Sequence, residues 1–359
     1  MKSERPCVLV TGVGGRSVGH QVLHALSLTG NRYKIICTDA DSFSFGLYLT
    51  PHRYLVPLAN DPDYLDAILA IIERENVDVI LPGTEAEVMR LVQCRGQLHD
   101  VGCKLIASPE SAVALCNDKA ELYRWLAREK IGVPTSVGVD DWPALVEKAG
   151  FPIVAKPATG SGGSRSVELL ATAAEVEDYI SRFPGSKENI VFQEYVGNAE
   201  SEYTVGVLIG RRGDIVDSIV MRRHLVGLSL GHSRKINGVR YALSTGYSQG
   251  IIVRDPGIQG FCEDLALRLG LQGPANIQLR VHNGEIKVFE VHPRFSGTTS
   301  IRAQAGFNEP DLMIQNHLLD ADPGRQSYRT NVAAIRAFQS ILVSTEEMES
   351  LPHYPYATS

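Results

Sequence analysis

The sequence predicts an α/β domain with a parallel sheet, followed by a larger α+β domain with antiparallel strands. The first hundred residues alternate apolar strand-like runs, such as CVLVTG and VDVILPG, with helical patterns, which is typical of βαβ units. From Phe151 onward strand-like runs such as PIVAKP, VFQEYV and EYTVGVLIG follow one another with few helices between them. The length of 359 residues, with 44% hydrophobic, is enough for two or three domains.

The first domain is expected to contain the strands CVLVTG, YKIICTD, VDVILPG and CKLIAS. Its clearest helix is predicted to start with Asp61 as the N-cap and Pro62 in the first turn, ahead of an apolar face. Two further helical patterns follow Ser108, and the run Ile131-Gly132-Val133-Pro134 stops the second of them. The second domain is therefore expected to start near residue 109.

In the second domain, a strand, a Gly-rich loop and another strand precede a helix that a capping box of Thr172 and Glu175 opens. Residues 225–250 are rich in Gly, Ser and basic side chains with weak periodicity, so a long active-site or surface loop is expected there. The apolar run AAIRAFQSILV predicts a closing strand, and the polar tail after it is expected to fray.

Composition and charge exclude several classes of protein. The net charge is −6 and no block of five or six like charges occurs, which argues against a nucleic-acid binder or a polybasic membrane anchor. No apolar stretch approaches the roughly 20 residues of a membrane span, and the N-terminal run is too short for a signal peptide. The six cysteines form no CxxC pair and are expected to be reduced. We expect a cytoplasmic protein acting on small molecules.

The stretch VTGVGGRSVGH is an imperfect dinucleotide fingerprint, because Gly12-x-Gly14 is followed by Ser17 where a third glycine belongs. Asp39 would then be the ribose ligand. No tyrosine has a lysine four residues on, as a short-chain dehydrogenase would need. An NAD(P)-dependent oxidoreductase stays an alternative. The other interpretation is a tight turn at a helix N-terminus that accepts a carboxylate or phosphate.

A second Gly-rich stretch, KPATGSGGSRSV, lies between two strands and lacks the Gly-Lys-Ser/Thr of a P-loop. A glycine-rich hairpin tip beside Lys156 would present backbone N–H groups and one positive charge to phosphates. The alternative is a surface turn with a solvated lysine.

The run FEVHPRFSG alternates Glu290, His292 and Arg294 with apolar residues, so an extended strand places all three on one face. It belongs to a predicted hairpin that turns at Asn283-Gly284. A two-residue loop there would put Gln278 and Glu290 on opposite faces.

A three-residue loop, residues 282–284, instead gathers Asn276, Gln278, Glu290 and His292 on one face. Such oxygen ligands on adjacent strands suit a magnesium nucleotide site, and a solvated polar face is the alternative.

Five motifs in order carry a family resemblance: Asn117-Asp118-Lys119, Phe151 to Pro157 with its glycine loop, FQEYV with Glu202, Asn276-x-Gln278, and Glu290-x-His292-Pro293-Arg294. Over roughly residues 5–320 they resemble the ATP-grasp ligases, above all carbamoyl-phosphate synthetase large-subunit halves and pyrrolysine-pathway ligases. The resemblance implies a Rossmann-like pre-ATP-grasp domain (1–108), a two-lobed ATP-grasp domain (109–330, lid subdomain about 135–195), and a C-terminal strand and tail (331–359).

The resemblance also implies residue roles. It assigns ATP phosphates to Lys119 and Lys156, the flap to Gly162, Gly163 and Ser164, the adenine hinge to Gln193, Glu194, Tyr195 and Val196, and the ribose to Glu202. It assigns the metal to Gln278, Glu290 and His292, and catalysis to Arg294 together with Lys156. Position 292 departs from the asparagine usual in the family, and an imidazole favours Mn²⁺ over Mg²⁺.

The implied reaction is attack of a carboxylate on the γ-phosphoryl group of ATP, giving an acyl phosphate that an amine or related nucleophile captures. ATP and Mg²⁺ or Mn²⁺ are the expected cofactors, and a homodimer is compatible with the resemblance. A nucleotide-binding regulator without turnover is the alternative that His292 motivates. Glu85 or Glu87 is expected to bind a substrate ammonium group and Arg302 a substrate carboxylate, each weighed against a surface salt bridge. The run Arg222-Arg223-His224 would reach the phosphates or be solvated.

Overall fold

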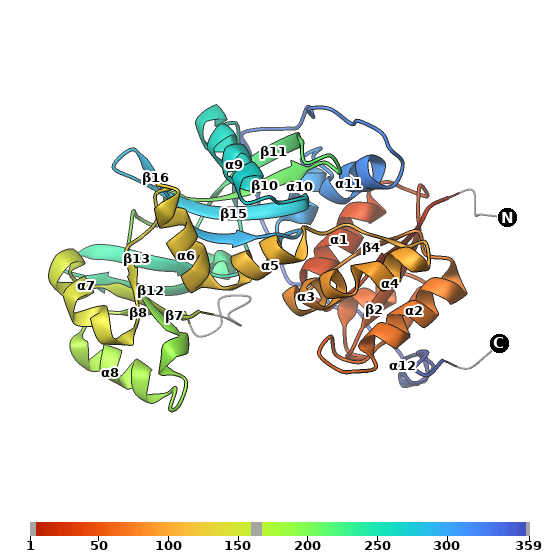
Figure 1. Cartoon of the computed structure of the whole chain (residues 1–359), viewed down its shortest axis with the longest axis horizontal. Coiled ribbons are helices and arrows are strands. Elements are labelled where there is room, and N and C mark those ends of the chain that lie inside the picture. The colour runs from red at the N-terminus through yellow and green to blue at the C-terminus, as the bar shows by residue number, and fades with distance from the viewer. Residues whose placement is uncertain (1–4, 159–166, 357–359) are drawn as a thin grey trace.

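The computed structural model describes residues 5–158 and 167–356. Its first part is a five-stranded parallel sheet of order β3-β2-β1-β4-β5, which confirms the expected α/β domain (Figure 1). The strands are β1 (Cys7–Val10), β2 (Lys34–Asp39), β3 (His52–Leu55), β4 (Val79–Leu81) and β5 (Lys104–Leu105). The helices are α1 (Val18–Ser27), α2 (Tyr64–Glu75), α3 (Glu85–Gln93) and α4 (Arg95–Asp100).

The predicted start of α2 is wrong by two residues. The helix begins at Tyr64 with Asp63 as its N-cap, and the carboxylate of Asp61 accepts a hydrogen bond from the backbone N–H of Asp63 (2.9 Å). Asp61 therefore stabilises a turn in front of the helix, as aspartate does in Asx turns.

A small antiparallel sheet of order β6-β9-β7-β8 lies at the left of Figure 1, in the segment that we predict to be the lid and call the lid below. Its elements are β6 (Ser136–Val137), α7 (Trp142–Ala149), β7 (Ile153–Pro157), β8 (Glu168–Leu170), α8 (Ala173–Ser181) and β9 (Ile190–Glu194). The Thr172 side chain accepts a hydrogen bond from the Glu175 N–H, so the predicted cap of α8 is confirmed. The glycine loop assigned to the flap, Gly162 to Ser164, lies outside the described residues.

The large sheet is six-stranded, of order β16-β15-β10-β11-β14-β17, and antiparallel throughout, as predicted for the second domain. Its strands are β10 (Glu202–Ile209), β11 (Ile215–Arg223), β14 (Gly250–Val253), β15 (Gly273–His282), β16 (Glu285–His292) and β17 (Val332–Ala334). The associated helices are α5 (Glu110–Asn117), α6 (Lys119–Arg128), α9 (Pro256–Arg268), α10 (Thr299–Gln304) and α11 (Glu309–His317).

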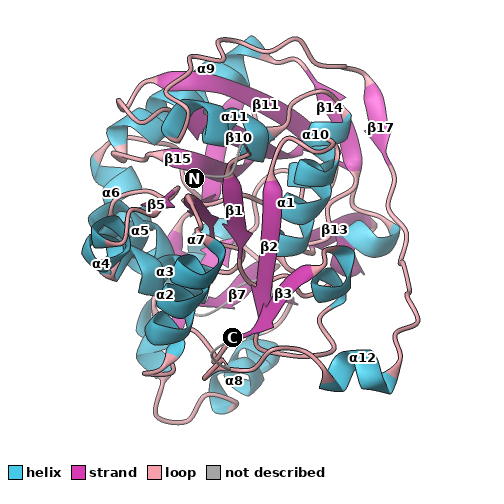
Figure 2. Ribbon diagram, turned by 90° about the vertical axis from the view of Figure 1, so that its right-hand side faces the viewer, coloured by secondary structure: helices cyan, strands magenta, loops and turns pink. Residues whose placement is uncertain are grey.

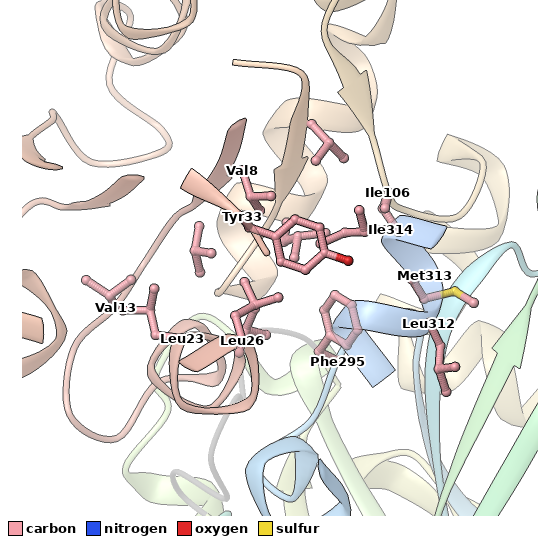
Figure 3. Packing of buried hydrophobic residues seen from close by; sticks show 14 of the residues in the cluster. Val8, Val13, Leu23, Leu26, Tyr33, Ile106, Phe295, Leu312, Met313 and Ile314 are labelled. Carbon is pink, nitrogen blue, oxygen red and sulfur yellow. The ribbon is translucent and has the colours of Figure 1, made fainter. Parts of the chain in front are cut away.

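The parallel-sheet domain and the large sheet share one apolar core. Val8 and Leu26 of the first domain belong to the same buried cluster as Leu208 and Ile219 of the large sheet, with Phe295 among them. Figure 3 shows part of this cluster. The other face of the large sheet packs on α6 and α9. A common core holds the two domains in a fixed relation, which matters because the site takes side chains from both.

Residues 225–250 do not form the expected long loop. They contain a hairpin of β12 (Leu230–Ile236) and β13 (Val239–Ser244), which turns at Asn237-Gly238, both with positive φ. Only Ala242 of the two strands is buried, so the apolar alternation that identifies a strand is weak here.

The C-terminal segment also differs from expectation. Only Val332–Ala334 of the predicted closing strand pairs with the sheet; the rest continues as a strap, residues 335–343, which runs outside the sheet to α12 (Thr345–Glu349) (Figure 2). Up to residue 356 the tail does not fray, because Leu351 is buried and Pro352 O accepts a hydrogen bond from Leu55 N–H (2.9 Å). Apolar anchors in a polar tail thus return the chain to the parallel sheet.

All six cysteines are free and buried, as the sequence predicted. In the described ranges no helix has the length and apolar character that crossing a membrane requires.

Candidate active site

The hairpin of β15 and β16 carries the polar row, and its geometry corrects the predicted loop. His282 pairs with Glu285, so the loop has two residues, Asn283 and Gly284, both with positive φ. The register then shifts at a β-bulge, so that Gln278 faces Glu290 after all. Phe289 is the extra residue, and a bulge of one residue restores the pairing that the two-residue loop would have moved to the opposite face.

Glu290 lies at the centre of the row. Its Oε2 accepts a hydrogen bond from Gln278 Nε2 (2.8 Å) and lies 3.1 Å from His292 Nε2, while its Oε1 lies 3.9 Å from Lys119 Nζ. Burial alone would raise the pKa of Glu290, but His292, Lys119 and Lys156 outweigh it and lower the pKa to about 2. The carboxylate is therefore ionised.

His292 bridges the two domains. Its Nδ1 lies 3.0 Å from Glu85 Oε1 at the start of α3, and its Nε2 faces Glu290. Glu85 also pairs with Arg294 Nη2 (2.5 Å). Burial lowers the pKa of His292, but the two carboxylates raise it above its ordinary value. A ring that donates at both nitrogens is an imidazolium and has no lone pair for a metal.

Lys156 lies in the interior of the lid, 6% exposed. Its ammonium group donates to Tyr123 Oη (2.5 Å) and to Gln193 Oε1 (3.0 Å), both neutral acceptors. Burial therefore lowers the pKa of Lys156 to about 8, although Glu290 acts in the opposite direction. Tyr123 was not identified from the sequence, because its helical position carries no motif; its Oη also donates to the carbonyl of Phe289 in the bulge (2.7 Å).

These groups surround a pocket of about 680 Å³, part of it open to solvent, between the lid and the large sheet. Its walls combine polar and apolar side chains: Lys119, Pro134, Val154, Lys156, Val167, Gln193, Glu194, Tyr195, Val196, Glu202, Leu243, Ser244, Gln278, Arg280, Phe289 and Glu290. All of the described hinge residues and both predicted phosphate lysines are included. A pocket that combines apolar walls with lysines and carboxylates fits a nucleotide with its metal.

Glu202, predicted to bind the ribose, lines this pocket but already has two cationic partners. It pairs with Arg223 Nη1 (2.9 Å) and Arg280 Nη2 (2.8 Å). Burial raises the pKa of Glu202, and the two arginines outweigh this effect and lower it. Arg223 also donates to Gln278 Oε1 (3.1 Å), so it connects Glu202 to the polar row.

Of the basic run 222–224, only Arg223 points inward. Arg222 and His224 are exposed, whereas Arg223 is 3% exposed. The period-2 alternation of β11 was the signal that could have separated them.

Arg302, predicted as a carboxylate partner, lies apart from the pocket in the core. Its side chain is fully buried, pairs with Glu309 (2.7 Å) and donates to Asn276 Oδ1 (2.8 Å). Its charge is already neutralised within the protein, so the structure gives no support to a substrate contact there.

Glu87 is likewise enclosed: it is 6% exposed, accepts hydrogen bonds from Thr84 and Tyr64, and burial raises its pKa to about 7. Glu85, in contrast, lies at the interface with the polar row.

The first glycine turn leads into α1, with Ser17 as the N-cap. The Gly14 N–H donates to Asp39 Oδ2 (2.8 Å), so the carboxylate that a ribose would need is bound to the turn itself. The turn does precede a helix N-terminus, as expected, but nothing in its geometry favours a dinucleotide.

Comparisons with known proteins agree with this architecture. Residues 8–106 match the family model "PylC-like, N-terminal domain", and residues 186–340 match "ATP-grasp in the biosynthetic pathway with Ter operon". The carbamoyl phosphate synthase large chains of Methanoculleus marisnigri and Thermomicrobium roseum are both 24% identical, over 77% and 91% of this chain. The chain spans only 25% and 30% of the length of these relatives.

Solved structures share the fold. N5-carboxyaminoimidazole synthetase from Staphylococcus aureus, complexed with ADP, has a TM-score of 0.66 at 15% identity, covering 91% of this chain and 81% of that one. The L-amino acid ligase from Bacillus licheniformis has a TM-score of 0.63 at 17% identity, covering 88% and 74%. With this fold around a pocket that two lysines line, the two family matches show a PylC-like N-terminal domain followed by an ATP-grasp domain.

Proposed function

We propose that the protein is an ATP-dependent ligase that activates a carboxylate as an acyl phosphate and transfers the acyl group to an amine or related nucleophile. The observation that carries this proposal is that Lys119, Lys156 and Glu290 line one pocket, while Glu85 and His292 connect Arg294 to Glu290. Phosphoryl transfer needs reactants held in line and charge neutralised, and this cluster supplies both without a protein nucleophile.

Each part of the chain has a defined task in this proposal. The lid lysine Lys156 and the helix-terminal Lys119 bind phosphate oxygens. The backbone from Glu194 to Val196 lies along the pocket wall where an adenine edge would bind. Arg294, at the end of the row and in contact with Glu85, faces the first domain, where the carboxylate would enter.

A magnesium ion fits the donors beside Glu290. In the described residues no cluster of three His, Cys, Asp or Glu side chains makes a complete metal site. The donors there are the ionised carboxylate of Glu290 and the amide oxygen of Gln278, which accepts a hydrogen bond from Arg223 (3.1 Å), and Mg²⁺ is commonly held by one or two carboxylates plus substrate phosphates. When bound there, the ion would neutralise charge on the transferring phosphate. His292 joins the ligands only after losing its proton.

The test is substrate-dependent ADP release with a library of amino acids and carboxylic acids, with hydroxylamine added to trap acyl phosphates. Lys156→Ala and Glu290→Ala should abolish both signals while leaving the fold intact, because both side chains act on the nucleotide. Lys104→Ala and Glu285→Ala, at exposed positions of β5 and β16, are the matched controls. Near-normal turnover in either site variant would refute the assignment.

A nucleotide-binding regulator without turnover is the second candidate, and His292 favours it because an imidazolium occupies a predicted ligand position. Tight ATP binding without ADP release under every library condition would select it. The carboxylate, the nucleophile and a homodimeric state stay predictions.

A further inference from the structure

In the strap that follows β17, the side chain of one charged residue, Arg336, points toward the interior of the molecule. Ile335 is 87% exposed and Phe338 is 75% exposed, but Arg336 between them is half-buried. Its backbone N–H donates to Gln249 Oε1 (2.9 Å), which fixes the strap at this point. The direction of the Arg336 side chain is therefore set by the fold and not by solvent.

The guanidinium group of Arg336 joins three separate parts of the chain. Nε donates to Ser248 O (3.0 Å), Nη1 to Gln21 Oε1 (3.1 Å), and Nη2 to Gly297 O. The group also stacks over the ring of Tyr247 at 4.9 Å. Every one of these partners is neutral.

Other inward arginines of the site have a carboxylate partner, and Arg336 has none among the described residues. Arg223 pairs with Glu202, Arg294 with Glu85, and each pair brings opposite charges within 3.0 Å. Burial lowers the pKa of Arg336, Tyr247 raises it and Arg223 lowers it further, so the charged side chain that acts on Arg336 is another cation. A partly buried cation without a counterion is costly, and an anion from outside would offset that cost.

Arg336 lies at the edge of the molecule where the substrate should enter. Its Nη2 reaches the loop that directly follows Arg294. Its Nη1 reaches Gln21 on α1, and the first turn of α1 donates to Gly83 O (3.3 Å), two residues before Glu85. The carboxyl ends of parallel strands are where open α/β sheets bind ligands.

We propose that Arg336 binds a carboxylate of the substrate that the reaction does not consume, so that this ligase acts on compounds of the amino-acid class. The inference rests on the proposed ligase function and adds to it the position that recognises the substrate. A carboxylate matches the single charge of one guanidinium group, whereas a phosphomonoester brings about −1.5 to −2 at neutral pH. Arg336 takes the role that the sequence had suggested for Arg302.

An arginine that has only neutral partners is not necessarily part of a binding site, and Arg95 is an example. Its guanidinium group donates only to the carbonyls of Leu105 (3.0 Å), Ala107 (2.8 Å) and Ser108 (3.0 Å), one short segment beside β5. It cross-links its own domain and does not contact the loops around the polar row. Arg95 is therefore a matched control for loss of a neutral-partnered arginine.

The experiment compares the twenty L-amino acids with their α-amides in substrate-dependent ADP release at saturating ATP. For the wild type, the acid of a productive pair should have the higher kcat/KM. Arg336→Gln should lower that kcat/KM about 10- to 150-fold, mainly through KM, because a hydrogen bond to a charged group is lost. The values for the amide and the KM for ATP should stay within about twofold. The control variants Arg95→Gln and Ile335→Ala should leave the kcat/KM for the acid and for the amide unchanged.

Arg336→Lys, which keeps the charge without the planar fork, should retain an intermediate preference for the acid. An acid preference that survives Arg336→Gln overturns the proposal. If no acid stimulates ADP release, the ligase function fails by itself, and the carboxylate site is then decided by thermal shift with the same pairs. An increase in Tm by acids alone that Arg336→Gln removes supports the site. No acid-specific increase in the wild type, or an increase only with inorganic phosphate, overturns it.

Discussion

Raising the pH above 8 should weaken ATP binding through a single side chain, Lys156. Its buried ammonium group donates to the hydroxyl of Tyr123 on α6 and to the amide oxygen of Gln193 on β9, and neither compensates its charge. Burial therefore lowers its pKa to about 8, even with Glu290 nearby. The cation that should bind the phosphates is complete below this value and is lost as the pH rises through it.

The magnitude follows from the titration. If only the ammonium form binds the phosphates, the apparent Kd for ATP rises by a factor of about ten for each pH unit above 8, or about 1.4 kcal/mol per unit. Between pH 7 and pH 8 the Kd should change by no more than about twofold. Bound phosphates favour the charged lysine, so the transition belongs to the free protein.

The assay is a titration with a non-hydrolysable ATP analogue between about pH 6.5 and 9.5, without metal. Lys156→Arg, which stays charged over this range, should bind with a flat pH profile. Lys104→Arg, at an exposed position, should follow the wild type. A constant Kd in the wild type, or the same slope in Lys156→Arg, would refute the reasoning.

Three further predictions test other parts of the structure. Glu309→Gln should lower the free energy of unfolding by about 3–5 kcal/mol, because it leaves Arg302 buried and unpaired. The control Glu175→Gln, which breaks a half-exposed pair with Arg234, should lower it by about 1 kcal/mol or less. Urea denaturation measures both changes. Gly12→Ala should cost about 1–3 kcal/mol in the same assay, since φ is +59° and a Cβ would collide with a buried carboxylate. His292→Asn should flatten the pH dependence of metal-activated ADP release and shift preference from Mn²⁺ towards Mg²⁺; unchanged metal ratios and pH profiles would remove the histidine from the ligands.

Local patterns were sufficient for most of the fold. Alternation along strands placed Glu290, His292 and Arg294 on one face, and the βαβ pattern located the parallel sheet. For the hairpin, the predicted pairing of Gln278 with Glu290 is right, but the three-residue loop from which it was predicted is wrong. The Asn283-Gly284 turn has two residues as its sequence favours, and the bulge at Phe289, which carries no distinctive residue type, sets the register.

Residues that depend on distant contacts could not be predicted. Arg302 and Arg336 are both arginines near the C-terminus, and nothing local distinguishes them. The structure buries one against Glu309 in the core and directs the other to a corner without a carboxylate. The contact of Tyr123 with Lys156 could not be predicted from the sequence either, because the two residues are 33 positions apart.

The contacts within the polar row determine what must change when a metal ion binds Glu290. Glu290 accepts from Gln278 and faces His292, whose other nitrogen faces Glu85, so the ligand atoms that a metal needs are engaged by neighbours of the same row. A cation that binds Glu290 must displace the imidazolium, and the loss of positive charge at His292 then leaves Glu85 with Arg294 as its principal partner. Nucleotide and metal binding would thereby change the electrostatics of the first domain's edge, where Arg336 is proposed to hold the substrate. In the proposed site, His292 would therefore couple metal binding to substrate binding, because loss of its proton changes the charge beside carboxylates of both domains.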